Sequence, residues 1–313
     1  MTFELGLHEI SDNVWAYLQP DGSWGYSNAG LVSGDGSSLL VDTLFDLRLT
    51  AKMLEAMAPH TASRPIDTVV NTHSNGDHCH GNQLVGAGRV ITSAATASEM
   101  AELPASALAA MMKLDLGEDG NRFLSEAFGA FDFEGIEVGP PTKTFRGVLE
   151  TDAGGRSVFL HEVGPAHTRG DVIAHLPDSG VVFTGDILFI GGTPIVWAGP
   201  VANWVAACRF IRTLAPSVVV PGHGPLTDLD GVQAVEDYFT WLTAEARLRR
   251  DGGLSAVDAA WDIELGSYGE WTDTERTVVN VDAIYADLDP GHQRMDALTG
   301  MQEMGRYRFR RGR

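Results

Sequence analysis

Four segments of the chain combine histidine and aspartate with neighbouring glycines. The segments are His73-Ser-Asn75-Gly-Asp77-His78, Gly164-Pro-Ala-His167-Thr-Arg-Gly-Asp171, Phe183-Thr-Gly-Asp186 and Pro221-Gly-His223-Gly224. Imidazole and carboxylate groups are the ligands that suit zinc and similar divalent ions. Glycine beside a ligand allows backbone conformations that aim several side chains at one point. The residue types therefore predict a site for divalent metal ions.

Each of these segments follows a short apolar stretch that is typical of a buried strand. Residues 66–70 precede the first segment, Val181-Val182 lead into the third, and residues 218–220 precede the fourth. Functional residues tend to lie on loops that a rigid scaffold positions. The spacing therefore predicts that strand ends bring the four segments together.

The other elements follow from apolar periodicity and from turn residues. We expect a strand over residues 13–18, a helix over residues 47–57 that ends at Pro59, and helices over residues 94–132 broken at Pro104 and around residues 117–120. Helices dominate after about residue 231. Strands and helices in this order predict an α/β fold of two packed sheets flanked by helices, four layers in all.

Charge and composition exclude some classes of protein. The chain has 313 residues, 42 acidic against 22 basic, and a formal net charge of -20, which disfavours a non-specific nucleic-acid binder. Residues 306–313 hold five arginines and no acid. We expect this basic tail to dock on an acidic surface of its own or a neighbouring subunit, or to stay disordered.

Cysteine content and the first residues bear on location. Two cysteines cannot form a disulfide framework, the N-terminal residues carry acids where a signal peptide needs basic and apolar regions, and no apolar run is long enough to span a bilayer. We therefore expect a soluble, cytoplasmic protein without membrane or nucleic-acid partners.

The chain resembles the hydrolases of the metallo-β-lactamase superfamily over about residues 12–230. That family's signature is H-x-H-x-D-H, followed by a distant histidine, a bridging aspartate and a last histidine. Six positions match in order: His73, Asp77, His78, His167, Asp186 and His223. The second histidine of the signature is Asn75 here, which gives the variant H-x-N-x-D-H.

The resemblance implies two neighbouring metal sites. His73, Asn75 and His167 would hold the first metal, and Asp77, His78 and His223 the second, with Asp186 bridging both. An amide oxygen is a poorer zinc ligand than imidazole, so the first site is expected to be the weaker. Two metals with a loose first one, a single metal at the second site, and a different metal all stay open. His80 could replace Asn75, although a surface or supporting position is favoured for it.

The resemblance also implies a function. We expect a metal-dependent hydrolase whose metal-bound hydroxide cleaves a small ester, thioester, lactone or amide, with Asp77 orienting or deprotonating the water. Zinc, as one or two ions, is the expected metal, with iron or manganese as alternatives. Two other readings stay open: a di-iron redox enzyme of the same fold, and a non-catalytic member with a degraded first site.

The resemblance and the element pattern together suggest a domain organisation. Residues 1–230 would form the αββα core, and residues 231–313 a helical extension that packs on the same domain and carries the basic tail. Residues 103–131 form a candidate lid insert, because they are longer than a connection requires and follow the first metal segment. The partner is expected to be a small-molecule substrate, and the helical C-terminal region offers material for a homo-oligomer.

Several residues near the four segments have two readings each. Asp42 ends an apolar strand and could support a ligating histidine, or could be a turn carboxylate. Cys79 could be a soft ligand or a buried small apolar residue. Four aromatic residues could form a substrate wall or pack in the interior: Trp24, Tyr26, Trp197 and Trp204.

Overall fold

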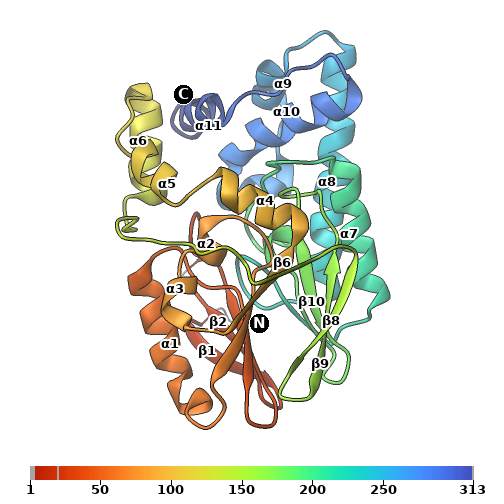
Figure 1. Cartoon of the computed structure of the whole chain (residues 1–313). Coiled ribbons are helices and arrows are strands. Elements are labelled where there is room, and N and C mark those ends of the chain that lie inside the picture. Colours follow the sequence, from red (N-terminus) through yellow and green to blue (C-terminus); the bar gives the residue numbers. More distant parts are fainter. Residues whose placement is uncertain (1–3, 20, 312–313) are drawn as a thin grey trace.

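The computed structural model describes residues 4–19 and 21–311, and its strands form two sheets (Figure 1). The first sheet has the order β1-β2-β3-β4-β5-β6-β7, and the second has the order β12-β11-β10-β9-β8. The strands are β1 (Gly6–Ser11), β2 (Val14–Leu18), β3 (Ala29–Ser33), β4 (Ser38–Val41), β5 (Ile66–Val70), β6 (Arg89–Ser93), β7 (Lys143–Phe145), β8 (Val148–Ala153), β9 (Arg156–Glu162), β10 (Val172–Leu176), β11 (Val181–Phe183) and β12 (Val218–Val220).

Alternating side chains explain why the first sheet is covered on both faces. In β2, Val14, Ala16 and Leu18 join the apolar cluster between the two sheets, whereas Trp15 joins a second cluster that lies against helix α1. Successive side chains of a strand point to opposite faces, so one short strand feeds two cores. The second sheet faces the same inter-sheet cluster, and its other face packs on helices. The predicted four-layer αββα arrangement is confirmed.

The helices cover the outer faces and one end of the sandwich (Figure 1). They are α1 (Leu47–Thr61), α2 (Gly76–Cys79), α3 (Asn82–Val85), α4 (Ala94–Glu102), α5 (Ser106–Met111), α6 (Gly117–Phe128), α7 (Val201–Thr213), α8 (Leu229–Asp251), α9 (Ala256–Asp262), α10 (Thr277–Leu288) and α11 (Ala297–Arg310), with 3-10 turns η1 (Gly185–Ile187), η2 (Gly266–Glu270) and η3 (Thr274–Arg276). None of the helices in the described ranges is both long and apolar enough to cross a membrane.

Two predicted helix boundaries were wrong. Helix α1 runs through Pro59, because the packing of buried Met53 and Met57 on the first sheet outweighs the hydrogen bond that proline removes. The break expected around residues 117–120 comes earlier, and α6 begins at Gly117. There, Asp115 Oδ1 accepts a hydrogen bond from the Gly117 N–H at 3.0 Å, within the turn that precedes the new helix.

Parallel strands bring the predicted metal segments to one edge. Strands β4, β5 and β6 are parallel in the first sheet, and β11 and β12 are parallel in the second. The carboxyl ends of parallel strands meet at the same edge of a sheet. Accordingly, the turns after β5, β11 and β12 open at one end of the sandwich.

The C-terminal helix packs beside the insert that was predicted as a lid. Helices α6 and α11 make an extensive contact and lie together at the top of Figure 1. Arg308 pairs with Glu275 at 3.1 Å, and Arg310 pairs with Asp119 on α6. The described part of the basic tail therefore docks on acidic groups of its own chain; Gly312 and Arg313 lie outside the described residues. The division at residue 230 and the lid role stay predictions.

Candidate metal centre

The first segment leaves strand β5 and turns into the one-turn helix α2. Asn75 stands just before this helix with extended backbone and makes no capping bond with its side chain, so its amide is free for other contacts. Gly76 has no room for a side chain, because a Cβ atom there would lie 2.3 Å from the ring of His80. The tight packing of this turn fixes where Asp77 and His78 point.

The other three ligand candidates come from the second sheet. His167 lies between β9 and β10, Asp186 lies in η1 directly after β11, and His223 follows β12. Gly222 lets the last two segments meet, because a Cβ atom at this position would lie 2.0 Å from Asp186 Oδ1. Only glycine allows the turn after β12 to pass so close to the carboxylate.

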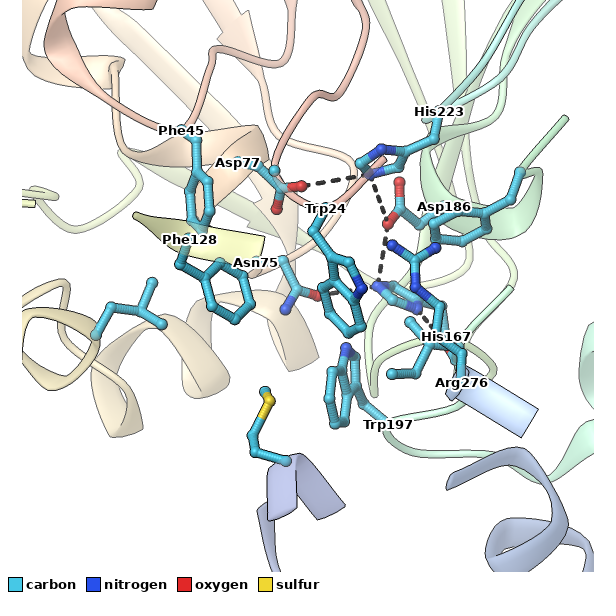
Figure 2. Close-up of a pocket in the computed structure, with 16 residues that line it drawn as sticks. Trp24, Phe45, Asn75, Asp77, Phe128, His167, Asp186, Trp197, His223 and Arg276 are labelled. Atoms are coloured by element: carbon cyan, nitrogen blue, oxygen red, sulfur yellow. Dashed lines mark hydrogen bonds and ion pairs between the residues drawn. The ribbon is translucent and has the colours of Figure 1, made fainter. Parts of the chain in front are cut away.

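The carboxylate of Asp186 lies at the centre of four imidazoles. Figure 2 shows three of the ligand candidates, Asp77, His167 and His223, around it. The Nε2 atoms approach its oxygens to 3.0 Å for His78, 3.3 Å for His167, 3.4 Å for His223 and 3.7 Å for His73. Asp77 Oδ2 lies 3.3 Å from His223 Nε2. The two sheets therefore bring all six matched residues together.

The six residues divide into two groups that could each hold a metal ion. One group is His73, His167 and Asp186, and the other is Asp77, His78 and His223; within each group the ligand atoms lie within 4.8 Å of one another. All six side chains are buried. The second group is the one that the family resemblance implies; the first has the two expected histidines together with Asp186, which the resemblance makes a bridging ligand.

The state of the ligand atoms fits a bound cation. His73 Nε2, His78 Nε2 and Asp186 Oδ1 are buried and have no hydrogen-bond partner among the described residues. A buried polar atom without a partner costs about 1–3 kcal/mol. Donor atoms of imidazole and carboxylate that converge in this way suit zinc and similar ions.

His78 is held by a carboxylate from the neighbouring strand. Its Nδ1 lies 2.8 Å from Asp42 Oδ2, so Nδ1 donates to Asp42 and Nε2 is the nitrogen that faces Asp186. Asp42 is fixed in turn by the N–H and the hydroxyl of Thr72, both at 2.7 Å. A carboxylate behind a ligating histidine orients the ring and raises its basicity. Of the two readings of Asp42, the contact with His78 is the one expected for a residue that supports a ligating histidine.

The other imidazoles are held by neutral groups. Nδ1 of His167 donates to the carbonyl of Ile195 at 2.7 Å, and Nδ1 of His223 donates to the carbonyl of Gly22 at 3.0 Å. Nδ1 of His73 lies 3.0 Å from the Thr72 hydroxyl. In each case Nε2 is the nitrogen left for a metal.

The C-terminal helices hold the loop that orients His167. Asn280 on α10 accepts a hydrogen bond from the N–H of Val196 at 2.9 Å and donates to the carbonyl of Pro194 at 2.8 Å. Arg294 donates to the carbonyls of Val196 and the two residues after it. The carbonyl of Ile195 is therefore fixed by residues that lie far along the chain.

Asn75, predicted as a ligand of the first metal, contacts the first group through His167. Its side-chain oxygen Oδ1 lies 3.0 Å from His167 Nε2. Because Nδ1 of His167 donates to the carbonyl of Ile195, the lone pair of Nε2 in a neutral ring faces this oxygen, which is itself an acceptor. Two acceptor atoms therefore converge where a first metal would bind.

The electrostatic environment differs between the two groups. Burial alone lowers the pKa of His223, but the neighbouring carboxylates of Asp186 and Asp77 outweigh it and raise the pKa to about 9. Burial lowers the pKa of His73 and of His167. For Asp77, burial raises the pKa, but the imidazoles of His78 and His223 outweigh it and lower the pKa to about 2. The second group therefore offers the stronger field for a cation.

Two residues of the first segment lie outside both groups. His80 is buried, with Nδ1 3.1 Å from the carbonyl of Phe45, and does not replace Asn75. A surface position for His80 is wrong, because the residue is buried; a supporting role for it stays a prediction. Cys79 is buried with its thiol against the carbonyl of Ser74, and burial raises its thiol pKa. It behaves as a small apolar residue.

A cavity of about 100 Å³ opens onto Asp77, His167, Asp186 and His223. Its walls are mostly aromatic and aliphatic (Figure 2): Trp24, Phe45, Leu108, Phe128, Phe189, Ile195, Trp197 and Met301, with one charged residue, Arg276. Trp24 and Trp197 thus line the cavity, and their role as a substrate wall stays a prediction. Trp204 is fully buried, and Tyr26 packs on Phe131.

The cavity also contains residues that the sequence did not single out. Leu108 and Phe128 come from the insert, Met301 comes from α11 and Arg276 ends η3. Phe45 follows the turn after β4. It lies three residues after Asp42 in the sequence, and this was the one feature that could have marked it as a residue of the site. Arg276 and Met301 belong to no motif, so their place in the cavity follows from the tertiary structure alone.

Comparison with known proteins agrees with this geometry. The family model described as the metallo-beta-lactamase superfamily matches residues 22–223. A solved structure of a stereoselective inverting sec-alkylsulfatase from Pseudomonas sp. superposes with a TM-score of 0.69 at 16% identity, over 90% of this chain and 50% of that chain. At this identity the likeness shows the fold.

Two curated proteins are similar over part of their length. An alkyl/aryl-sulfatase of Saccharomyces cerevisiae is 34% identical over 76 residues, which are 24% of this chain and 11% of that protein. The alpha subunit of a 2,4-dinitroanisole O-demethylase from Nocardioides sp. is 24% identical over 198 residues, 61% of this chain and 51% of that protein. The chain thus spans about half, or less, of the relatives it matches. The family match, the fold and the six matched positions together establish that the chain belongs to the metallo-beta-lactamase superfamily.

Proposed function

We propose that the chain is a metal-dependent hydrolase. The observation that carries this proposal is the convergence of four imidazoles and two carboxylates, in which buried ligand atoms of His73, His78 and Asp186 lack a hydrogen-bond partner among the described residues. A divalent ion bound here would lower the pKa of a coordinated water and polarise the bond to be cleaved. The chain's own residues would hold the ion, orient the water and exclude bulk solvent.

We assign the proton-accepting role to Asp77. Its side chain lines the cavity and is the most exposed of the six, at 9% for the residue, whereas the others are at 5% or less. Its carboxylate can therefore reach a water molecule as well as a metal ion. In the hydrolysis of an ester, the water adds its oxygen to the acyl carbon, the bond to the leaving oxygen breaks, and the leaving group takes up a proton.

We propose zinc as the metal and the second group as the tighter site. Asp77, His78 and His223 have a carboxylate ligand of their own, and Asp42 supports His78. The first group lacks a histidine at position 75, and the amide there already contacts His167. One tightly bound ion with a weaker second one is the arrangement that these contacts support. Iron or manganese would use the same ligand atoms.

The cavity supports a small substrate with an apolar or aromatic part. Its volume of about 100 Å³ and its aromatic walls favour an aryl or short alkyl group. Esters, thioesters, lactones and amides of this size are the proposed substrates. The names of the similar sulfatases add sulfate esters to this set.

Elemental analysis of the purified protein, together with a panel of 4-nitrophenyl esters, a thioester, a lactone and an anilide, tests the proposal. We expect zinc in the protein, and turnover that a chelator removes and zinc restores. Iron with a visible absorption band and no hydrolysis would favour the redox reading. A protein that takes up no zinc, manganese or iron and stays inactive would favour a degraded site.

A further inference from the structure

A buried arginine lies in the wall of the cavity beside the candidate ligands. Arg276 is only 1% exposed and lines the same cavity as Asp186 and His167. Figure 2 shows it on the side of these two residues, across from Phe45 and Phe128. A charged side chain is costly to bury unless its N–H groups find partners, so the partners of this guanidinium show what it is free to do.

Two of its three nitrogens are paired, and the third is not. Nη1 donates to the carbonyl of Thr193 at 2.9 Å, and Nη2 lies 3.1 Å from Asp273 Oδ2. Nε is buried and has no hydrogen-bond partner among the described residues. Because a buried N–H without a partner costs about 1–3 kcal/mol, an acceptor on a bound molecule would be stabilised there.

Aromatic rings fix the position of the guanidinium without using its N–H groups. Its central carbon lies 4.1 Å from the ring centre of Trp24 and 5.2 Å from that of Phe189. Trp24 is fixed in turn, since its indole N–H donates to Glu275 at 2.9 Å and Glu275 pairs with Arg308 on α11. Cation–π contacts attract the charge but leave the hydrogen-bonding edge free.

We propose that Arg276 binds an oxyanion that the substrate carries, next to the metal centre. Guanidinium donors match the oxygens of sulfate and carboxylate groups, and hydrogen bonds between charged groups are the strong ones. The apolar walls formed by Phe45, Phe128 and Met301 would take the rest of the substrate. The inference rests on the proposed hydrolase function and narrows its substrates to anionic esters, with the oxyanion either a sulfate ester group or a carboxylate.

Matched substrates and variants test this inference. The substrates are 4-nitrophenyl sulfate, the mono-4-nitrophenyl ester of succinate, and neutral 4-nitrophenyl acetate; the first two separate a sulfate ester from a carboxylate. The variants are Arg276→Gln and Arg276→Lys. The control is Arg122→Gln, which removes a guanidinium that lies 3.9 Å from the Phe309 ring but has a side chain that is 55% exposed.

We expect Arg276→Gln to lower kcat/KM for at least one anionic ester by roughly 10- to 100-fold, and for the acetate by less than about threefold. The control should change none of the three. Equal losses on anionic and neutral esters would overturn the inference. If Arg276→Gln does not fold, Arg276→Lys decides: a smaller but selective loss on the anionic esters supports the role, and no selectivity contradicts it.

A binding measurement separates this inference from the proposed function. Titration calorimetry with inorganic sulfate and the metal-loaded protein should show that Arg276→Gln weakens binding by roughly tenfold or more, with Arg122→Gln unchanged. Unchanged sulfate binding in Arg276→Gln would overturn the role of Arg276. If the wild type cleaves none of the esters, the hydrolase proposal fails, and sulfate binding still decides about Arg276.

Discussion

The two halves of the candidate metal centre share Asp186 but differ in what surrounds it. The second group, Asp77, His78 and His223, contains one carboxylate and is backed by another, that of Asp42. In the first group, His73 and His167 are backed by a hydroxyl and a carbonyl. Besides the shared Asp186, the second half therefore has two carboxylates, whereas the imidazoles of the first half are backed only by neutral dipoles.

The difference shows that one substitution does not affect both halves equally. Asn75 takes the place of a histidine on the side of the first group, where its amide contacts His167. The second group keeps all its ligands and their supports. Such a centre can lose metal affinity at the first group and keep a complete metal site at the second.

The largest expected effect comes from removing ligands of the second group. Asp77→Ala and His223→Ala should each lower kcat/KM by roughly 1000-fold or more, because the metal and the proton acceptor are lost together. His73→Ala should cost clearly less. Steady-state kinetics with the best ester of the panel measures these losses. Equal losses of kcat/KM in His73→Ala and in the two variants of the second group would contradict the difference between the two groups.

A smaller effect is expected from the support of His78. Asp42→Asn keeps the size of the side chain but removes its charge, and should weaken binding of the tighter ion by roughly 10- to 100-fold. Competition with a metallochromic dye measures the affinity. Asp67→Asn, which changes a carboxylate that is 45% exposed and pairs with Arg89, is the matched control and should leave the affinity unchanged.

Removal of the Asn75 amide should matter less than removal of its neighbour Asp77. Asn75→Ala abolishes the contact with His167 but leaves the second group complete, so we expect kcat/KM to fall by less than roughly tenfold. The comparison with Asp77→Ala uses the same assay and batch of metal. A loss as large as that of Asp77→Ala would show that the first group carries the reaction.

The smallest expected change in turnover comes from restoring the family residue. Asn75→His adds an imidazole to the first group and should raise the metal content from about one to about two ions per chain, with only a modest change in kcat. Elemental analysis of protein dialysed against a weak chelator measures this. If wild type and variant both retain two ions, Asn75 does not weaken the first site.

Strands could be predicted from the sequence where a short run rich in β-branched residues follows a turn signal such as Pro65. Residues 66–70 were expected as a strand and form β5 with the same bounds. Helix ends were less predictable, because the packing of Met53 and Met57 carries α1 past Pro59 and because α6 begins at Gly117 without a side-chain cap. Local propensity decides the elements, and tertiary contacts decide where they stop.

The ligand candidates could be found because each is tied to a strand end within a few residues. The proximity of Asn75 and His167, which lie 92 residues apart, was expected only through the family resemblance and not from local pattern. Arg276 and Met301, which reach the cavity from the C-terminal helical region, could not be found. Neither carries a periodic pattern or a motif, and only the packing of α10 and α11 against the core places them there.

The backbone of Asp42 limits what evolution can place at this position. Its φ of 62° lies in the left-handed region, which costs most residues about 1–2 kcal/mol and is tolerated best by glycine, asparagine and aspartate. Of these three, only aspartate provides a charged acceptor for His78. A related chain with glycine here would keep the turn and lose the acceptor. Residue 42 can therefore vary without loss of the fold, but any such change alters the basicity of His78.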